Sequence, residues 1–452
     1  MTHWSRSGAI NPTALPRRYP FAKLVRPRVG LMEAVTFLPQ EMGSPLFEVA
    51  STSLGNLTMT FPHVHGINGS DVRSRRLGGA GADLDPETAW VRAVVEGAER
   101  YASMVYQSAD FIVATADELG SQAIDLDTIP RCSEREYANP RNPIQPPSKD
   151  RLIRWVRGYS LISGQEKLVP AIMTHLYISA GPAENFWLPI STGVAAHTRL
   201  EAALISAICE SIERDGIALA WLARLPLRQI AIFEPAPERL APLLERLNAS
   251  AITQKFFDAT TDVGVPTVFS VQICDGHPSC SLFVSCATSL DPVAACGKAI
   301  REAAPGRNVM IKDRPIPASV EDFQEVTHGA DYYGRGGHES DFDFLLKGEG
   351  RTSLNAMRTE LPANASEGQA LGFLIDRLRS LGMEAVAIDL TTDELRECGL
   401  WVVRVIIPQL VPISFVHSAR YLGTPRIYEQ ARRFGIRNLN PETVNSGPMP
   451  FA

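Results

Sequence analysis

The chain has 452 residues, which is enough for about three average domains or for one large multilayered domain. Apolar residues make up 45% of it and charged residues 21%, as in an ordinary globular protein, and the net charge of −6 argues against nucleic-acid binding. The sequence contains no signal-peptide core and no run of roughly 18 apolar residues, so we expect no membrane span and predict a cytoplasmic protein.

The first 80 residues are rich in proline, glycine and polar residues. Short apolar stretches at 46–50 and 57–61 predict strands or extended arms. We therefore interpret residues 1–80 as an extended N-terminal region.

A helix is predicted to begin directly after this region. Asp85 is a good N-cap, and Pro86 suits the first helical position. Apolar side chains form one stripe along the helix, whereas Arg92, Glu96 and Glu99 project from the opposite side. This second face is either an ordinary solvated surface or a functional one, and the helix alone does not separate the two interpretations.

The stretch after this helix is predicted to be irregular. Five prolines and several charged residues in 130–150 indicate an irregular connection. Strands are predicted at 155–162 and 169–178, and a turn of small residues follows at 191–196. That turn leads into another helix, and a strand, turn and helix in succession often place a ligand at the turn.

The stretch 198–222 predicts the central helix of the protein. It is apolar around the full turn, which is the pattern of a helix buried on every side. Its middle nevertheless carries four ionisable residues: Glu210, Glu213, Arg214 and Asp215. Burying an unpaired charge is costly, so a cation, a partner charge or a water-filled cleft must meet them. This conflict marks a candidate site.

The pattern Glu-x-x-Glu-Arg occurs in both helices, at 96–100 and at 210–214. Residues three apart leave a helix on the same side, so each pair of glutamates shares one face. Carboxylates suit Mg²⁺, which shares its sites with substrate phosphates, and Arg100 and Arg214 would hold phosphate oxygens. We therefore predict a magnesium and nucleotide site between two helices. The rival interpretation, an iron or manganese bundle, needs Glu-x-x-His, which neither helix has.

The remaining sequence alternates strands with helices, which predicts a mixed α/β fold. The predicted strands are 229–233, 266–273, 282–286, 385–390 and 401–407, and the predicted helices are 237–248, 292–304, 368–381 and 393–398. We expect the helix at 292–304 to end at Pro305-Gly306. It carries Glu302, and Arg307 follows it. A surface loop or lid is predicted within 315–350, and composition alone predicts a disordered tail.

Several spaced blocks of the sequence resemble the YcaO family, specifically the azoline-forming cyclodehydratase (D-type) subunit of thiazole/oxazole-modified peptide biosynthesis. In chain order the blocks are LVRPRVGLMEAV, AVVEGAERYAS, STGVAAHTRLEAALISAICESIERDG, PVAACGKAIREAAPGR, GLWVVRVIIPQLVP and PMPFA. The resemblance covers about 21–452. It implies a YcaO-like α/β fold with the ATP site between helices packed on mixed sheets, a catalytic domain at 81–440, and a tail at 441–452 that reaches toward the active site.

The resemblance implies an enzyme that uses ATP and Mg²⁺ on a ribosomally made precursor peptide, as in antibiotic biosynthesis. In such enzymes a Cys, Ser or Thr side chain of the peptide attacks the preceding backbone carbonyl. ATP phosphorylates the oxygen of the resulting hemiorthoamide, and loss of phosphate leaves an azoline with net loss of one water. Magnesium and arginines would neutralise charge during phosphoryl transfer.

The family's site residues can be carried over to matching positions of this chain. The implied metal ligands are Glu96, Glu99, Glu210 and Glu213. The implied nucleotide site comprises these four residues with Arg92, Arg100, Arg214, Glu302 and Arg307. The implied catalytic residues are Arg100, Arg214, Pro448 and Pro450, with Phe451 beside them in the tail.

Some positions depart from the family's pattern. Ala82 stands where the family has a lysine, Arg92 where it has a serine, and Pro305 where it has a glutamine. Met449 and Ala452 replace the histidine and the last proline of the tail. The loss of a lysine and a serine would weaken ATP binding unless Arg92 supplies the missing charge.

The resemblance also implies partners. No leader-binding module is expected before residue 21, so we expect a separate leader-binding, activating-enzyme-like protein, with a flavin dehydrogenase as a further member of the complex, and a homodimer of this chain. Two alternatives remain open: related chemistry that makes thioamides or amidines, and a non-catalytic subunit that holds the peptide or a partner. The second is favoured by Ala82, Arg92 and Pro305.

Overall fold

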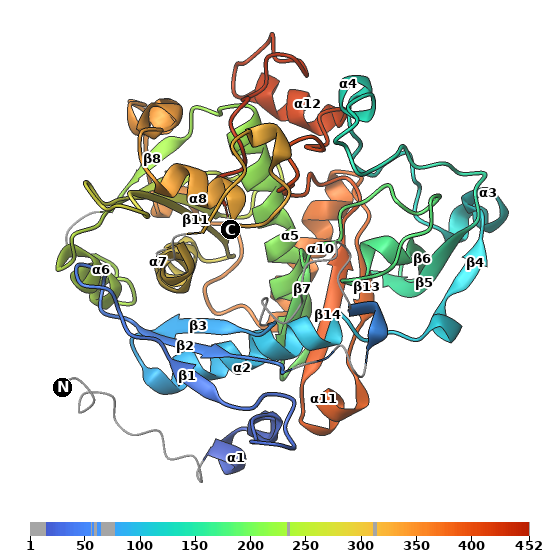
Figure 1. Cartoon of the computed structure of the whole chain (residues 1–452), viewed down its shortest axis with the longest axis horizontal. Helices are drawn as coiled ribbons and strands as arrows, with labels where there is room; N and C mark the ends of the chain where they lie inside the picture. The colour runs from blue at the N-terminus through green and yellow to red at the C-terminus, as the bar shows by residue number, and fades with distance from the viewer. Residues whose placement is uncertain are drawn as a thin grey trace.

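The computed structural model describes residues 15–55, 57, 61–64, 77–232, 236–310 and 314–451. Three sheets and the helices between them form the mixed α/β fold that the alternating pattern predicts (Figure 1). The longer helices are α2 (Pro86–Ala102), α5 (Leu200–Leu222), α6 (Ala241–Asn248), α7 (Pro292–Met310), α10 (Glu367–Ser380) and α12 (Pro425–Arg433). The shorter ones are α1 (Leu15–Arg18), α3 (Ala116–Leu119), α4 (Glu134–Tyr137), α8 (His328–Gly334), α9 (Asp343–Leu346) and α11 (Asp393–Glu397).

The strands form three sheets, which are mostly antiparallel. The first contains β1 (Val35–Phe37), β2 (Glu48–Thr52) and β3 (Ala80–Asp83). The second has the order β11 (Leu282–Thr288), β10 (Thr267–Ile273), β9 (Thr253–Asp258), β8 (Arg228–Ala231) and β12 (Arg351–Ser353). The third has the order β4 (Ile112–Ala114), β5 (Ile153–Ser160), β13 (Val386–Asp389), β14 (Trp401–Ile406) and β7 (Val194–His197), and β6 (Glu166–Pro170) also pairs with β5.

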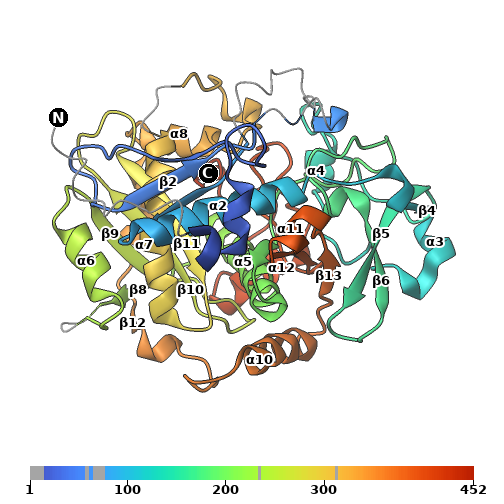
Figure 2. The same cartoon turned by 90° about the horizontal axis from the view of Figure 1, so that it is seen from below.

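Helix α5 lies at the centre of the molecule, between the second and third sheets (Figures 1 and 2). It contacts β10 and β11 of one sheet and β7 and β14 of the other. Because both sheets cover it, the helix needs apolar residues around the full turn. The buried central helix predicted from the sequence is therefore confirmed.

Helix α2 packs on β2, β3 and β7, and its start is as predicted. The Asp85 side chain accepts a hydrogen bond from the Thr88 backbone N–H, and Pro86 begins the helix. Strand β3 can approach α2 closely because it contains a glycine, Gly81, where the two elements meet. A Cβ at Gly81 would lie only 2.5 Å from the carbonyl oxygen of Ala89, so the packing of β3 on α2 requires glycine there.

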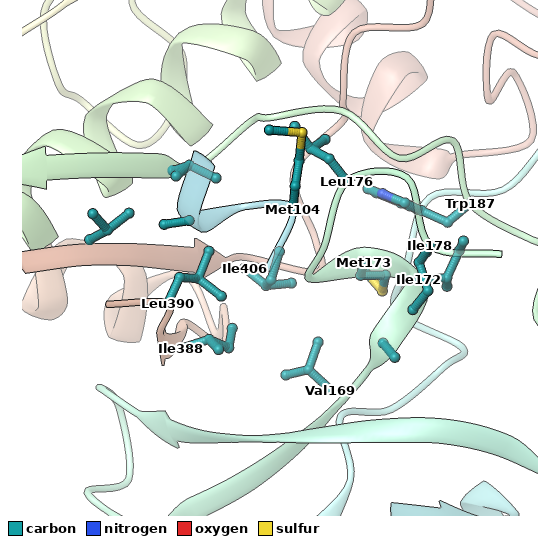
Figure 3. Packing of buried hydrophobic residues seen from close by; sticks show 14 of the residues in the cluster. Met104, Val169, Ile172, Met173, Leu176, Ile178, Trp187, Ile388, Leu390 and Ile406 are labelled. Atoms are coloured by element: carbon teal, nitrogen blue, oxygen red, sulfur yellow. The ribbon is translucent and has the colours of Figure 1, made fainter. Parts of the chain in front are cut away.

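The core explains one difference from the predicted strands. The predicted strand 169–178 is β6 only as far as Pro170, and residues 171–173 then form a 3-10 turn. Figure 3 shows side chains of this segment, including Ile172 and Met173, packing together with Ile388 of β13 and Ile406 of β14. Burial of this turn over the third sheet thus outweighs the strand preference of its apolar residues. Strand β9 was not predicted at all.

Two further predictions of local structure were wrong. Helix α7 does not end at Pro305-Gly306 but continues to Met310. Its last turns pack on Phe283, whose ring would lie 2.3 Å from a Cβ at Gly306, so tertiary packing offsets the hydrogen bond that Pro305 removes. The segment 315–350 is not an open surface loop, because it contains α8 and α9 and buries Tyr333 and Phe342.

The end of the described chain is also ordered, so the disorder that composition predicts is wrong. Residues 448–451 are buried. The indole Nε1–H of Trp221, near the end of α5, donates a hydrogen bond of 3.3 Å to the carbonyl oxygen of Gly447. The ring of Phe451 packs edge-on against Phe269 of β10.

Candidate active site

Both glutamates of α2 accept hydrogen bonds from backbone groups, although the Glu96 side chain is still 35% exposed. One Glu96 oxygen accepts a hydrogen bond of 2.8 Å from the backbone N–H of Ala80, which begins β3. A Glu99 oxygen accepts one of 2.8 Å from the backbone N–H of Ala196 in β7. Arg100 pairs with Glu96 at 3.1 Å. Backbone groups of neighbouring elements thus fix both carboxylates, which an ordinary solvated face does not require, although Glu96 and Arg100 remain 35% and 40% exposed.

The two glutamates of α5 are held in the same way. Glu210 accepts a hydrogen bond of 3.1 Å from the backbone N–H of Gly193 and pairs with Arg214 at 3.1 Å. Glu213 is buried and accepts one of 2.9 Å from the backbone N–H of Thr288, at the end of β11. The Lys298 ammonium lies 3.2 Å from the same Glu213 oxygen.

Strand β7 and the turn before it bring the two glutamate pairs together. Ala196 binds Glu99 of α2, and Gly193 binds Glu210 of α5. The two pairs influence one another electrically: burial raises the pKa of Glu99 to about 8, and the nearby charges of Glu96 and Glu210 add to the increase. The two repeats of the sequence motif therefore meet in space, as predicted from their charges.

Helix α7 adds a further carboxylate, Glu302, and a lysine. Lys298 lies one turn before Glu302, 3.6 Å from it, so the lysine bridges Glu213 and Glu302. Loss of hydration on burial raises the pKa of Glu302 to about 7. The negative charges of Glu213 and Glu210 act in the same direction, whereas the positive charges of Lys298 and Arg214 act against it. Sequence reasoning missed Lys298, and its signal was the four-residue spacing to Glu302.

We refer to the five carboxylates Glu96, Glu99, Glu210, Glu213 and Glu302 as the glutamate cluster. Three cations pair with its members: Arg100, Arg214 and Lys298. The cluster therefore carries more negative than positive groups, and the neighbouring carboxylates add to the effect of burial, which is the main cause of the raised pKa of Glu99 and Glu302. Within the described part of the chain, no three acidic, histidine or cysteine side chains are close enough to enclose a metal ion by themselves.

The donor set nevertheless fits Mg²⁺. It consists of carboxylate oxygens only, and the excess negative charge favours a cation. Mg²⁺ usually takes one or two carboxylates and completes its coordination with waters and substrate phosphates. A complete protein cage is thus not needed for a magnesium and nucleotide site.

Asp215, the fourth charged residue in the middle of α5, belongs to a different group. It is fully buried and faces away from the cluster, toward Arg426 of α12. The guanidinium of Arg426 donates two hydrogen bonds to Asp215, of 2.8 and 2.7 Å, and it also pairs with Asp262. The expectation that all four ionisable residues mark one site is therefore wrong for Asp215.

Other predicted site residues lie apart from the cluster. Arg307 is buried near Cys280, and no hydrogen bond or ion pair joins it to the five glutamates in the described structure. Pro448 and Pro450 are buried in the tail, which contacts α5 at Trp221, about two helical turns beyond Glu213. Their assignment to the site remains a prediction.

A second cationic group flanks the cluster. Arg92 pairs with Asp83 at 3.1 Å, and Arg301 of α7 lies 3.6 Å from the same Asp83 oxygen. Arg404 of β14 is fully buried near Glu210, and burial lowers its pKa to about 10. Sequence reasoning missed Asp83, Arg301 and Arg404 because nothing local separates them from ordinary surface or strand residues.

None of the described helices is long and apolar enough to cross a membrane.

Comparisons with known proteins add to this geometry. Two curated relatives are both uncharacterized. One lies in the tfuA 3′ region of Rhizobium leguminosarum bv. trifolii and is 26% identical over 343 residues, covering 73% of this chain and 76% of its own. The other, from Methanothermobacter thermautotrophicus, is 28% identical over 271 residues, covering 58% of this chain and 66% of its own.

Solved structures share the fold at low sequence identity. A heterocyclase in complex with substrate and cofactor matches 97% of this chain with a TM-score of 0.78 and 21% identity. This chain spans only 57% of that protein, and 56% of the heterocyclase TruD, which matches with a TM-score of 0.61 and 20% identity. A YcaO from Methanopyrus kandleri bound with AMPPCP and Mg²⁺ matches 89% of this chain and 92% of its own, with a TM-score of 0.60 and 16% identity.

The family model described as "YcaO cyclodehydratase, ATP- and Mg²⁺-binding" matches residues 78–411, which contain both glutamate pairs and Glu302. That match covers well over half of the chain. The protein therefore belongs to the YcaO cyclodehydratase family, whose members bind ATP and Mg²⁺.

Proposed function

We propose that this protein uses MgATP, bound between α2 and α5, to activate a backbone amide of a ribosomally made precursor peptide and so convert Cys, Ser or Thr residues into azolines. The observation that supports this most directly is the glutamate cluster. Carboxylates from two distant repeats are held at one place by backbone N–H groups of β3, β7 and β11, with too few cations to balance them.

The roles of individual side chains follow from their positions. Glu99 and Glu210, whose charges interact across the two helices, would hold Mg²⁺ together with Glu96 and Glu213. When bound, the ion neutralises charge on the transferring phosphoryl group. Arg100 and Arg214 keep the glutamates in place by i,i+4 pairing and present N–H groups to phosphate oxygens.

The peptide chemistry proceeds at the carbonyl next to the reacting side chain. A thiol or hydroxyl of the peptide adds to that carbonyl, the resulting oxygen takes the γ-phosphoryl group of ATP, and phosphate leaves as the ring double bond forms. The net change is one ATP hydrolysed and one water lost from the peptide. The chain's own contribution is positioning and electrostatic stabilisation, which account for most of the catalysis of phosphoryl transfer.

The partners belong to the proposal as well. The microcin synthetase McbBCD complex, which shares this fold, has been solved alone and with pro-MccB17 bound. By analogy, we propose that a separate leader-binding protein presents the precursor peptide to this chain, with a flavin dehydrogenase acting on the product. A homodimer and a cytoplasmic location remain part of the same proposal.

A reconstituted reaction tests the function. Protein, partner and precursor peptide are incubated with MgATP, and phosphate release is measured together with the peptide mass. We expect phosphate release coupled to a peptide lighter by one water, and loss of both in Glu210→Ala and Glu213→Ala. Glu201→Ala, an exposed glutamate in the first turn of the same helix, is the matched control and keeps activity.

The outcomes separate the alternatives. Exchange of a peptide oxygen for sulfur when a sulfur donor is supplied would contradict the azoline product but retain the ATP site. Absence of phosphate release with every partner would favour a non-catalytic subunit, which the departures from the family pattern at Ala82, Arg92 and Pro305 also favour. Full activity in Glu210→Ala would refute the site assignment.

A further inference from the structure

Two arginines next to the glutamate cluster share a single carboxylate. Arg92 comes from α2 and Arg301 from α7, and both approach the same oxygen of Asp83 at the end of β3, at 3.1 and 3.6 Å. The other Asp83 oxygen already accepts a hydrogen bond of 2.8 Å from the backbone N–H of Leu84. Asp83 therefore offers one negative charge to two guanidinium groups, and one positive charge is left over.

The hydrogen bonding of these arginines is also incomplete. Within the described structure, the buried Nε of Arg92 has no hydrogen-bond acceptor, and the buried Nε of Arg301 faces Asp83 from 3.6 Å, which is too far for a hydrogen bond. A guanidinium keeps its charge at any ordinary pH, so this arrangement costs free energy unless an anion completes it. The side chains are 40% and 19% exposed, so a solute can reach them.

The position of the pair relates it to the cluster. Arg92 lies one turn before Glu96 on α2, and Arg301 directly precedes Glu302 on α7. The cluster's own cations, Arg100, Arg214 and Lys298, are each paired with a glutamate. The surplus positive charge at this end of the site thus lies on Arg92 and Arg301.

We propose that Arg92 and Arg301, positioned by Asp83, bind phosphate oxygens of the nucleotide's polyphosphate chain while the glutamate cluster holds its Mg²⁺. This inference rests on the proposed ATP site. A metal–polyphosphate presents a cation and anionic oxygens side by side. The cation complements the glutamate cluster, and the phosphate oxygens complement Arg92 and Arg301. The planar guanidinium fork suits phosphate oxygens, which it can bind bidentately.

The competing interpretation is a purely structural clamp that ties β3 to α2 and α7. The two interpretations predict a different dependence of nucleotide affinity on the number of phosphates. A phosphate-binding pair discriminates MgATP from AMP, because AMP lacks the polyphosphate and its metal. A clamp affects the stability of the fold and the binding of all adenine nucleotides alike.

The test is titration calorimetry of MgATP, MgADP and AMP with the full chain. We expect Arg92→Ala and Arg301→Ala each to bind MgATP about tenfold more weakly, from the loss of charge-assisted hydrogen bonds, with AMP affinity unchanged. Arg92→Lys and Arg301→Lys keep the charge without the fork, so their MgATP affinity should be intermediate. Arg157→Ala, which removes an exposed arginine paired with Glu166, is the control and should bind as the wild type.

Three results would overturn the inference. Unchanged MgATP affinity in both alanine variants would exclude the pair from the nucleotide site. An equal loss for MgATP and AMP, accompanied by a lower melting temperature in the alanine and lysine variants alike, would establish the clamp. Failure of the wild type to bind MgATP at all would instead refute the proposed function, and the inference with it.

Discussion

Two groups of acidic residues, one around Glu213 and one around Asp215, lie on opposite sides of the middle of α5, and their charge balance differs. Asp215 has two short hydrogen bonds from Arg426 and one of 2.9 Å from the backbone N–H of Val411. Arg426 also pairs with Asp262, and a second cation, Arg433, lies 3.8 Å from Asp262, so two arginines face two carboxylates. Every charge in this group has a partner, and the neighbouring carboxylates raise the pKa of Arg426 further above its ordinary value.

The glutamate cluster, in contrast, is short of positive charge. Burial, together with the neighbouring carboxylates, raises the pKa of Glu99 to about 8 and that of Glu302 to about 7, so each holds a proton at a pH where an exposed glutamate would be ionised. Each group contains a buried carboxylate, Asp215 in one and Glu213 in the other, so burial alone does not mark a functional site. The difference is whether the protein itself supplies the compensating charge or leaves it for a ligand.

The largest expected effect comes from breaking the balanced group. Asp215→Asn removes a charge from a fully buried pair and leaves Arg426 with only Asp262, so we expect the free energy of unfolding to fall by about 3 kcal/mol. Chemical denaturation measures this. The control is Asp376→Asn, at an exposed pair with Arg379, which should leave the unfolding midpoint unchanged. A small loss in Asp215→Asn would mean that Arg426 is solvated by another route.

Binding of MgATP should depend on the glutamate cluster but not on the group around Asp215. Saturating MgATP stabilises a protein that binds it, by about 2.7 kcal/mol at a hundred times the dissociation constant. We expect this stabilisation to raise the melting temperature of the wild type and of Asp215→Asn, although the variant has a lower melting temperature without ligand. It should disappear in Glu210→Gln and when EDTA removes the metal. An equal increase in Glu210→Gln would place the ion elsewhere.

Neutralising a member of the unbalanced cluster should stabilise the ligand-free protein. Burial raises the pKa of Glu99 in the folded protein to about 8, above the ordinary value of 4.5, so folding takes up a proton and stability falls as pH rises from about 4.5 to 8. Below that window the residue contributes no penalty. Glu99→Gln should therefore be more stable than the wild type at pH 9 without metal, by about 1–2 kcal/mol, and equal to it near pH 4.

Thermal unfolding as a function of pH, in EDTA, measures this difference. The exposed Glu201→Gln is the control and should follow the wild type at every pH. Glu99→Gln should also lose MgATP binding, so that its gain in stability is matched by a loss of function. If Glu99→Gln were less stable than the wild type at pH 9, the cluster would not be short of positive charge.

The smallest effect is expected at the start of α5, where Arg199 pairs with Glu367 at the protein surface. Water and salt screen this pair, although its N–O distance of 2.9 Å is close to the 2.8 Å of the buried Arg426–Asp215 pair. Glu367→Gln should leave the midpoint of chemical unfolding unchanged within error. A measurable loss would mean that distance, rather than burial, governs the strength of ion pairs on this helix.

The sequence by itself determined most of what depends on neighbouring residues. The start of α2 followed from Asp85 and Pro86, the burial of α5 from its apolar composition, and the pairing of glutamates on one helix face from their three-residue spacing. The mixed α/β fold followed from the alternation of strands and helices. Sequence blocks also led to the family that the model match later established.

Only the tertiary structure decided which charges meet. Asp215 lies two positions after Glu213, but its partner Arg426 lies 211 positions further along the chain, and no local pattern predicts that pairing. In the same way Lys298, Arg301 and Asp83 join the site through the packing of α7 on β3. Local sequence fixes the conformation of a helix and the direction of its side chains, whereas the charge environment of a buried carboxylate is set by whichever distant residues fold against it.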